Sequence, residues 1–124
     1  MSKFVQIQTT LQDLTMIKQS LDDLEIHYSE NRVYNHRYST FKGQVPILVK
    51  HNRLEFGLRE TEDEVYEVIG DDMQLRGINK LMEGVQQRYA YHKVKTETEK
   101  AGFVLVEENT GRDNVIRMTV RRWS

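Results

Sequence analysis

The segment VPILVKHNRLEFGLRETEDEVYEVI, residues 45–69, decides the fold class of this chain. It holds three strand-like stretches, VPILVKH, RLEFGLRE and Glu64–Ile69, separated by short polar steps. Apolar and polar residues alternate from Leu54 to Leu58, which is typical of a β-strand with one buried face. Because two-residue to three-residue steps suit tight hairpins, we predict an antiparallel meander of three strands.

A helix is predicted before the meander. Thr10 is a candidate N-cap with Asp13 three residues later, as in an approximate capping box. Apolar residues then recur at spacings of three or four, at Leu11, Leu14, Ile17, Leu21 and Leu24. This spacing places them on one face of a helix of about 14 residues.

A second, longer helix is predicted after the meander, over Ile78–Lys100. Its apolar face holds Ile78, Leu81, Met82, Val85 and Tyr89. Gly102 follows the last helical residue, where positive φ is easily adopted only by glycine.

The remaining segments complete the predicted order. Phe4–Gln8 and Glu25–Ser29 look extended, and Phe103–Glu108 with Asn114–Trp123 predicts a final hairpin. Residues 30–44 are polar with scattered aromatics, and they indicate either a long loop or a weak edge strand.

These elements predict one α+β domain over residues 1–124, in the order β-α-β-β-β-β-α-β-β. Strands with one polar face and two amphipathic helices favour a mainly antiparallel sheet with both helices packed on one face. The other face of the sheet would then stay open.

Composition and charge exclude several classes of function. Eighteen basic and 19 acidic residues give a net charge of −1, so no overall field attracts nucleic acid or anionic lipid. The absence of cysteine excludes disulfides and thiolate metal sites. The opening segment MSKFVQIQTTLQDL has neither the apolar region of a signal peptide nor a transit-peptide pattern, and we expect no membrane association.

The segment QQRYAYHKV, residues 86–94, holds the strongest candidate site. Arg88, Tyr91 and His92 are three and four positions apart and meet on one helix surface. Together they can bind a phosphate or carboxylate, and the histidine can act as an acid or base. Arg117 and Arg121 from the last strand could join them. In the alternative interpretation, Tyr89 and His92 line the core edge while Arg88 and Tyr91 cover it.

Other motifs give no cofactor or metal. His27, His36 and His51 have no ligand spacing, and the pair Asp71-Asp72 has no oxygen-rich loop beside it. Phosphate loops, dinucleotide fingerprints, zincin motifs and nucleophile elbows are all missing. The basic end GRDNVIRMTVRRW could follow a phosphate backbone, but the slightly acidic chain argues against a nucleic-acid partner.

Several stretches together resemble one family. In chain order they are MSKF, FKGQ, LEFGL, YEVIGDD, QRYAYHKV, ETEKAGF and VRRW. The chain resembles the uncharacterised plastid and cyanobacterial family called hypothetical chloroplast reading frame thirty-five, over nearly its whole length. This resemblance implies a protein of the plastid stroma or cyanobacterial cytoplasm, and it supplies no catalytic residues.

We therefore expect a non-enzymatic interaction or regulatory module that binds a protein partner or a second copy through the open sheet face or an edge strand. The alternative is a domain that binds a small anionic ligand through Arg88, Tyr91 and His92, with Arg117 and Arg121. Only this alternative allows an enzyme, with His92 as acid or base. The residues leave open the partner, the ligand, the oligomeric state and any catalytic group.

Overall fold

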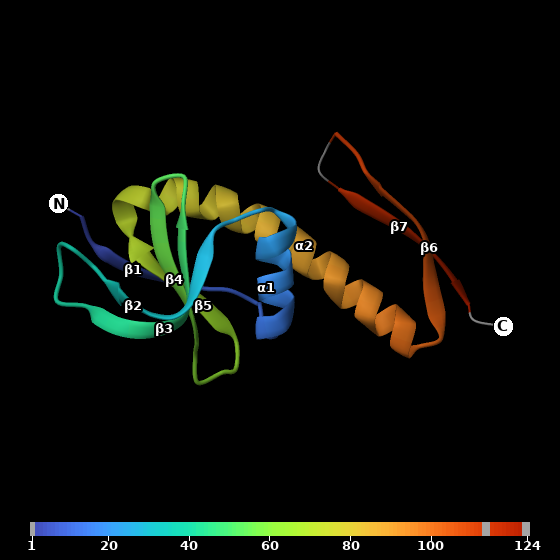
Figure 1. Cartoon of the computed structure of the whole chain (residues 1–124), viewed down its shortest axis with the longest axis horizontal. Coiled ribbons are helices and arrows are strands. Elements are labelled where there is room, and N and C mark those ends of the chain that lie inside the picture. Colours follow the sequence, from blue (N-terminus) through green and yellow to red (C-terminus); the bar gives the residue numbers. More distant parts are fainter. Residues whose placement is uncertain (1, 113–114, 123–124) are drawn as a thin grey trace.

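The computed structural model describes residues 2–112 and 115–122, with the backbone alone at 105–107. Its elements follow the predicted order (Figure 1). They are β1 (Phe4–Gln8), α1 (Leu14–Asp23), β2 (Tyr28–Asn35), β3 (Lys42–His51), β4 (Leu54–Glu60), β5 (Tyr66–Asp71), the short 3-10 helix η1 (Asp72–Gln74), α2 (Leu75–Lys100), β6 (Phe103–Thr110) and β7 (Ile116–Arg122).

The described strands form two antiparallel sheets. Five of them form the main sheet, in the order β1-β5-β4-β3-β2. The predicted meander, β3 to β5, forms the centre of this sheet. The ribbon of β6 and β7 forms a separate two-stranded sheet beside the far half of α2 (Figure 1). The α+β class with a mainly antiparallel sheet is thus confirmed, and the final hairpin does not extend the main sheet.

Some predicted boundaries need correction. Helix α1 begins at Leu14, and its N-cap is Asp13, whose carboxylate accepts a hydrogen bond from a backbone N–H of the first turn (3.1 Å). The prediction of Thr10 as the N-cap was wrong, because the preceding Thr9 ties the chain to β5. Its hydroxyl donates to the carbonyl of Tyr66 (2.6 Å), which holds this segment extended.

Two further segments differ from the expected bounds. Helix α2 begins at Leu75, three residues before the predicted start, because η1 leads directly into it. Within residues 30–44, the edge strand is confirmed and the long loop is not, since β2 continues to Asn35. Gly102 has φ +89° just beyond α2, as its position predicted.

Both helices pack on the same face of the main sheet, as predicted. They bury Ile17 and Leu21 of α1 together with the apolar face of α2 against inward side chains of the sheet. These sheet side chains are Ile47, Val49, Phe56, Leu58, Tyr66 and Val68. Each such side chain contributes about 1.5–3 kcal/mol when it is fully buried, so this core supplies most of the stability.

The opposite face of the sheet is not open. Tyr34, Val45, Leu48 and Ile69 are buried there in a second, smaller core, and Phe4 and Phe41 pack against them. The rings of Phe4 and Phe41 stack with their centroids 4.2 Å apart, which joins β1 to the residue just before β3. The β2–β3 hairpin therefore curls over the outer face, and the expected free face is covered.

The curl begins where the alternation along β3 breaks. Ile47 and Val49 point toward the helices, whereas Val45 lies on the outer face against Gly57 of β4. Pro46 lies between the two patterns and ends the pairing of β3 with β4, because it has no N–H to donate. A Cβ on Gly57 would lie 3.1 Å from side-chain atoms of both Ile69 and Val45, so only glycine fits without displacement.

We predict that Gly57→Val lowers the free energy of unfolding by about 1–3 kcal/mol, because added methyl groups overpack the second core. The measurement is equilibrium unfolding in urea followed by circular dichroism. Gly84→Ala, inside α2, is the matched control, since a Cβ there makes an ordinary 3.4 Å contact with Leu24 at the end of α1. This control should raise stability by about 0.5–1 kcal/mol. A Gly57→Val variant as stable as the parent would contradict the packed outer face.

Candidate functional site

One turn of α2 holds the start of α1. The hydroxyl of Tyr89 accepts hydrogen bonds from the backbone N–H groups of Gln12 (3.1 Å) and Asp13 (3.0 Å). Such N–H groups at the start of a helix have no partner within the helix itself. Tyr89 is also buried in the main core, so this member of the aromatic and basic segment of α2 holds the two helices together.

The same turn holds the end of α1 through charge. Arg88 donates to Asp23 Oδ2 from Nε (3.1 Å) and from Nη2 (2.9 Å). His92 Nε2 donates to the same oxygen at 2.6 Å. Arg88 Nη1 also lies 3.5 Å from Glu108 Oε1 on β6. We call Asp23, Arg88, His92 and Glu108 the carboxylate network.

The structure thus brings Arg88, Tyr91 and His92 together as predicted. Tyr91 is buried, and the guanidinium of Arg88 lies 4.3 Å from the centre of its ring. Burial raises the pKa of the Tyr91 hydroxyl, and the hydrogen bond and charge of Glu108 raise it further. The positions suited to an external anion are occupied by the chain's own Asp23 and Glu108.

The two arginines predicted to join this cluster lie on β7. Arg117 is opposite Asn109 of β6 and Arg121 is opposite Val104, and both side chains are exposed. They belong to the ribbon that packs beside α2.

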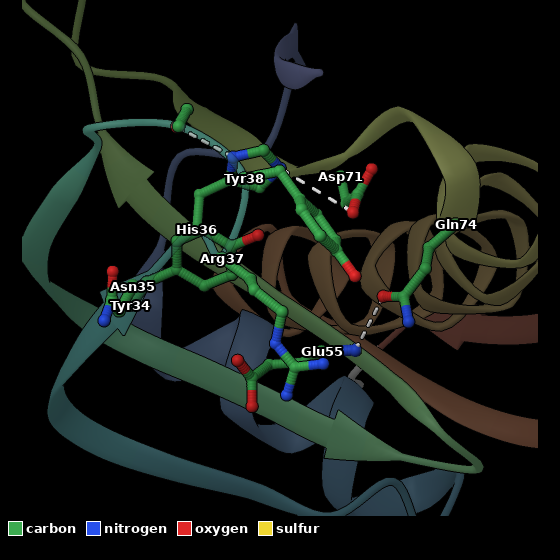
Figure 2. Close-up of a pocket in the computed structure, with 9 residues that line it drawn as sticks. Tyr34, Asn35, His36, Arg37, Tyr38, Glu55, Asp71 and Gln74 are labelled. Atoms are coloured by element: carbon green, nitrogen blue, oxygen red, sulfur yellow. Dashed lines mark hydrogen bonds and ion pairs between the residues drawn. The ribbon is translucent and has the colours of Figure 1, made fainter. Parts of the chain in front are cut away.

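A second candidate site lies on the outer face of the main sheet (Figure 2). It is a cavity of about 690 Å³ between the tip of the β2–β3 hairpin, the start of β4 and the end of β5. Its polar side chains include Tyr34, His36, Tyr38, Glu55, Asp71 and Gln74. We call this cavity the outer pocket.

The imidazole of His36 is the unusual feature of the outer pocket, because it is only 2% exposed. Its Nδ1 is hydrogen-bonded to Ser39 Oγ at 2.7 Å. Its Nε2 is buried with no hydrogen-bond partner among the described residues, and it lies 3.7 Å from Asp71 Oδ2. A buried donor or acceptor left unpaired costs about 1–3 kcal/mol.

Other polar groups of the outer pocket are fixed in place. Asp71 Oδ1 accepts the backbone N–H of Met73 (3.0 Å), which directs the second carboxylate oxygen toward His36. Gln74 accepts the N–H of Glu55 (3.0 Å) and donates to the carbonyl of Arg53 (2.9 Å).

Burial, with the charges of Glu55 and Asp71, raises the pKa of Tyr34 to about 12. Both carboxylates therefore act on the same phenol and make this part of the pocket electrically negative. The outer pocket can accept hydrogen bonds and favour positive charge. Within residues 2–112 and 115–122, no group of three or more potential ligands is arranged to hold a metal ion.

Sequence reasoning missed the outer pocket. It dismissed His36 because no partner stood at a ligand spacing, and the partner Asp71 comes from a distant strand. The only signal was the concentration of polar and aromatic residues in NHRYS, residues 35–39, which begins at the last residue of β2.

The fold and its sites define a small α+β protein with a covered antiparallel sheet and a helix that carries a two-stranded ribbon. No described helix is long and apolar enough to cross a membrane. The chain belongs to the ycf35 family, whose family model is described as a protein of unknown function (DUF1257) and matches residues 20–119. The predicted resemblance is confirmed.

Three uncharacterized ycf35 proteins show this similarity along the whole chain. The protein of Pyropia yezoensis is 30% identical, covering 100% of this chain and 99% of the relative. The proteins of Guillardia theta and Cyanophora paradoxa are 28% and 29% identical, each covering 99% of this chain and 98% of the relative. No solved structure matches.

The carboxylate network makes stability depend on pH. Burial raises the pKa of Asp23, but hydrogen bonds and charge from His92 and Arg88 outweigh it and hold the pKa below its ordinary value of 3.8. The ionised carboxylate therefore stabilises the fold above pH 3.8. This contribution disappears as the pH falls through the lowered pKa of the folded state.

We predict that Asp23→Asn lowers the free energy of unfolding at pH 7 by about 1 kcal/mol, because solvent screens part of the interaction. The difference from the parent should shrink below pH 3.8, as measured by urea unfolding at several pH values. Asp63→Asn, in the exposed turn after β4, is the control and should change stability little. A constant difference between Asp23→Asn and the parent across this range would contradict the network.

Proposed function

We propose that this chain is a non-enzymatic interaction module that binds a protein partner through its arm. The arm consists of α2 from Ala90 to Lys100 together with β6 and β7. The observation that carries the proposal is that β6 and β7 pair only with each other among the described strands. Their outer edges therefore offer backbone groups to an additional strand.

The arm also exposes apolar surface. A two-stranded ribbon alone is marginally stable in water, so it depends on what packs against it. Tyr91 and Val94 of α2, with Ile116 and Met118 of β7, border a hollow of about 280 Å³. Val94 is 42% exposed and Val120 is 38% exposed, which leaves apolar area beside this hollow.

The charge of the two strands favours a different protein over a second copy. The β7 segment IRMTVRR carries three arginines and no acid, whereas β6, FVLVEENT, carries two glutamates and no base. Centred self-pairing of β7 would place Arg117 opposite Arg121, and like charges directly opposite destabilise a sheet. Pairing of β6 with β7 of another copy would be head-to-tail and open-ended. We therefore propose an acidic, extended segment of another protein as the partner.

We infer action in the plastid stroma or a cyanobacterial cytoplasm from the plastid-type ycf relatives. A small anionic ligand at Arg88 and His92 would have to displace the Asp23 carboxylate, so this alternative predicts competition with the carboxylate network.

Site-specific photo-crosslinking tests the interaction module. A benzoylphenylalanine at Val120 on β7 should form adducts with another protein in an extract of the native cells. The same group at Val33 is the matched control, because Val33 is also an exposed valine, 51% exposed, on the edge strand of the main sheet. Intact mass measurement identifies the adducts.

Charge reversal then tests the acidic partner. Arg121→Glu should reduce the Val120 adduct several-fold, whereas Arg32→Glu on β2 should leave it unchanged, because only β7 meets the acidic segment. Adducts at Val33 as strong as those at Val120 would contradict the role of the arm. An adduct with twice the mass of this chain would contradict a heterologous partner.

A further inference from the structure

The outer pocket carries an inference that is independent of the arm. We propose that it binds a small molecule through a protonated primary amine. The amine lies between the carboxylates of Asp71 and Glu55 and against the rings of Tyr34 and Tyr38. The volume of about 690 Å³ is in the usual range for small-molecule sites.

The buried imidazole of His36 lies beside the carboxylate of Asp71. Ser39 Oγ accepts the N–H of Phe41 (3.1 Å), so its own hydrogen is available to donate to His36 Nδ1. When Ser39 donates in this way, the proton of a neutral imidazole lies on Nε2, which faces Asp71 Oδ2 at 3.7 Å. This distance is longer than a hydrogen bond. A small movement of Asp71 or of the turn at residues 36–39 would bring the two atoms within hydrogen-bond distance.

The orientation of Asp71 leaves acceptor capacity for a ligand. One oxygen accepts the N–H of Met73, and the other faces His36 and the cavity (Figure 2). A carboxylate has about four acceptor positions, so an ammonium group can bind here while both internal contacts stay in place. The carboxylate of Glu55 lines the same cavity, and one of its oxygens lies 3.4 Å from Lys50 Nζ on the exposed strand surface.

The charges facing the cavity favour a cation over an anion. Asp71 and Glu55 are both negative, and their fields meet at the hydroxyl of Tyr34. That hydroxyl can accept one proton of an ammonium group. The tyrosine rings also attract cations through their negative faces. Arg37 also lines the cavity, and its positive charge repels the proposed ligand.

Titration calorimetry of the full chain tests the proposal, with 1,4-diaminobutane and ethanolamine as cationic probes and inorganic phosphate as the anionic probe. Both amines should bind saturably at one site, and phosphate should not bind. Glu55→Gln should weaken amine binding about tenfold, because one charge-assisted hydrogen bond is lost. Glu62→Gln, in an exposed turn, changes the net charge equally and should leave binding unchanged.

Two further variants keep the test decisive. Asp71→Asn should also weaken binding, but Asp71 caps η1, so its folding must first be checked by circular dichroism. Arg37→Ala should tighten amine binding several-fold, since a repelling charge is removed. No saturable binding of either amine would overturn the proposal. So would equal weakening by Glu55→Gln and Glu62→Gln, or phosphate binding that Arg37→Ala abolishes.

Discussion

The structure depends on the contact of one turn of α2 with both ends of α1. Tyr89 accepts the N–H groups at the start of α1, and Arg88 with His92 binds Asp23 at its end. Since α1 is only ten residues long, these contacts fix both its position and its direction across the sheet. They explain why both helices cover one face, and why the aromatic and basic cluster of α2 is part of the scaffold.

The same contact divides α2 into two halves with different roles. The first half buries Ile78, Met82 and Val85 against the main sheet. The second half of α2 extends away from the main sheet and leads into the ribbon of β6 and β7 (Figure 1). Glu108 of β6 forms an ion pair with Arg88, so the ribbon is linked by charge to the turn of α2 that holds α1. A partner bound at the arm would therefore bind next to the carboxylate network.

Because the outer face of the main sheet is covered, the candidate binding sites lie in the outer pocket and on the arm. A flat, open sheet would have offered one large surface, but Pro46 and Gly57 allow the β2–β3 hairpin to curl over it. The curl buries a second core and leaves the outer pocket between His36 and Asp71. The family model spans residues 20–119, and this range includes the pocket and most of the arm.

The sequence by itself determined the kind and order of the elements, because a period of two or of three to four residues reports which side of one segment is buried. It also placed Arg88, Tyr91 and His92 together, since residues three and four apart on a helix are neighbours. Only the tertiary structure decided that Asp23 fills this cluster, that the ribbon stands apart and that Asp71 faces His36. These contacts join residues far apart in the chain, and they depend on how the sheet curls and the helices cross, which local periodicity does not report.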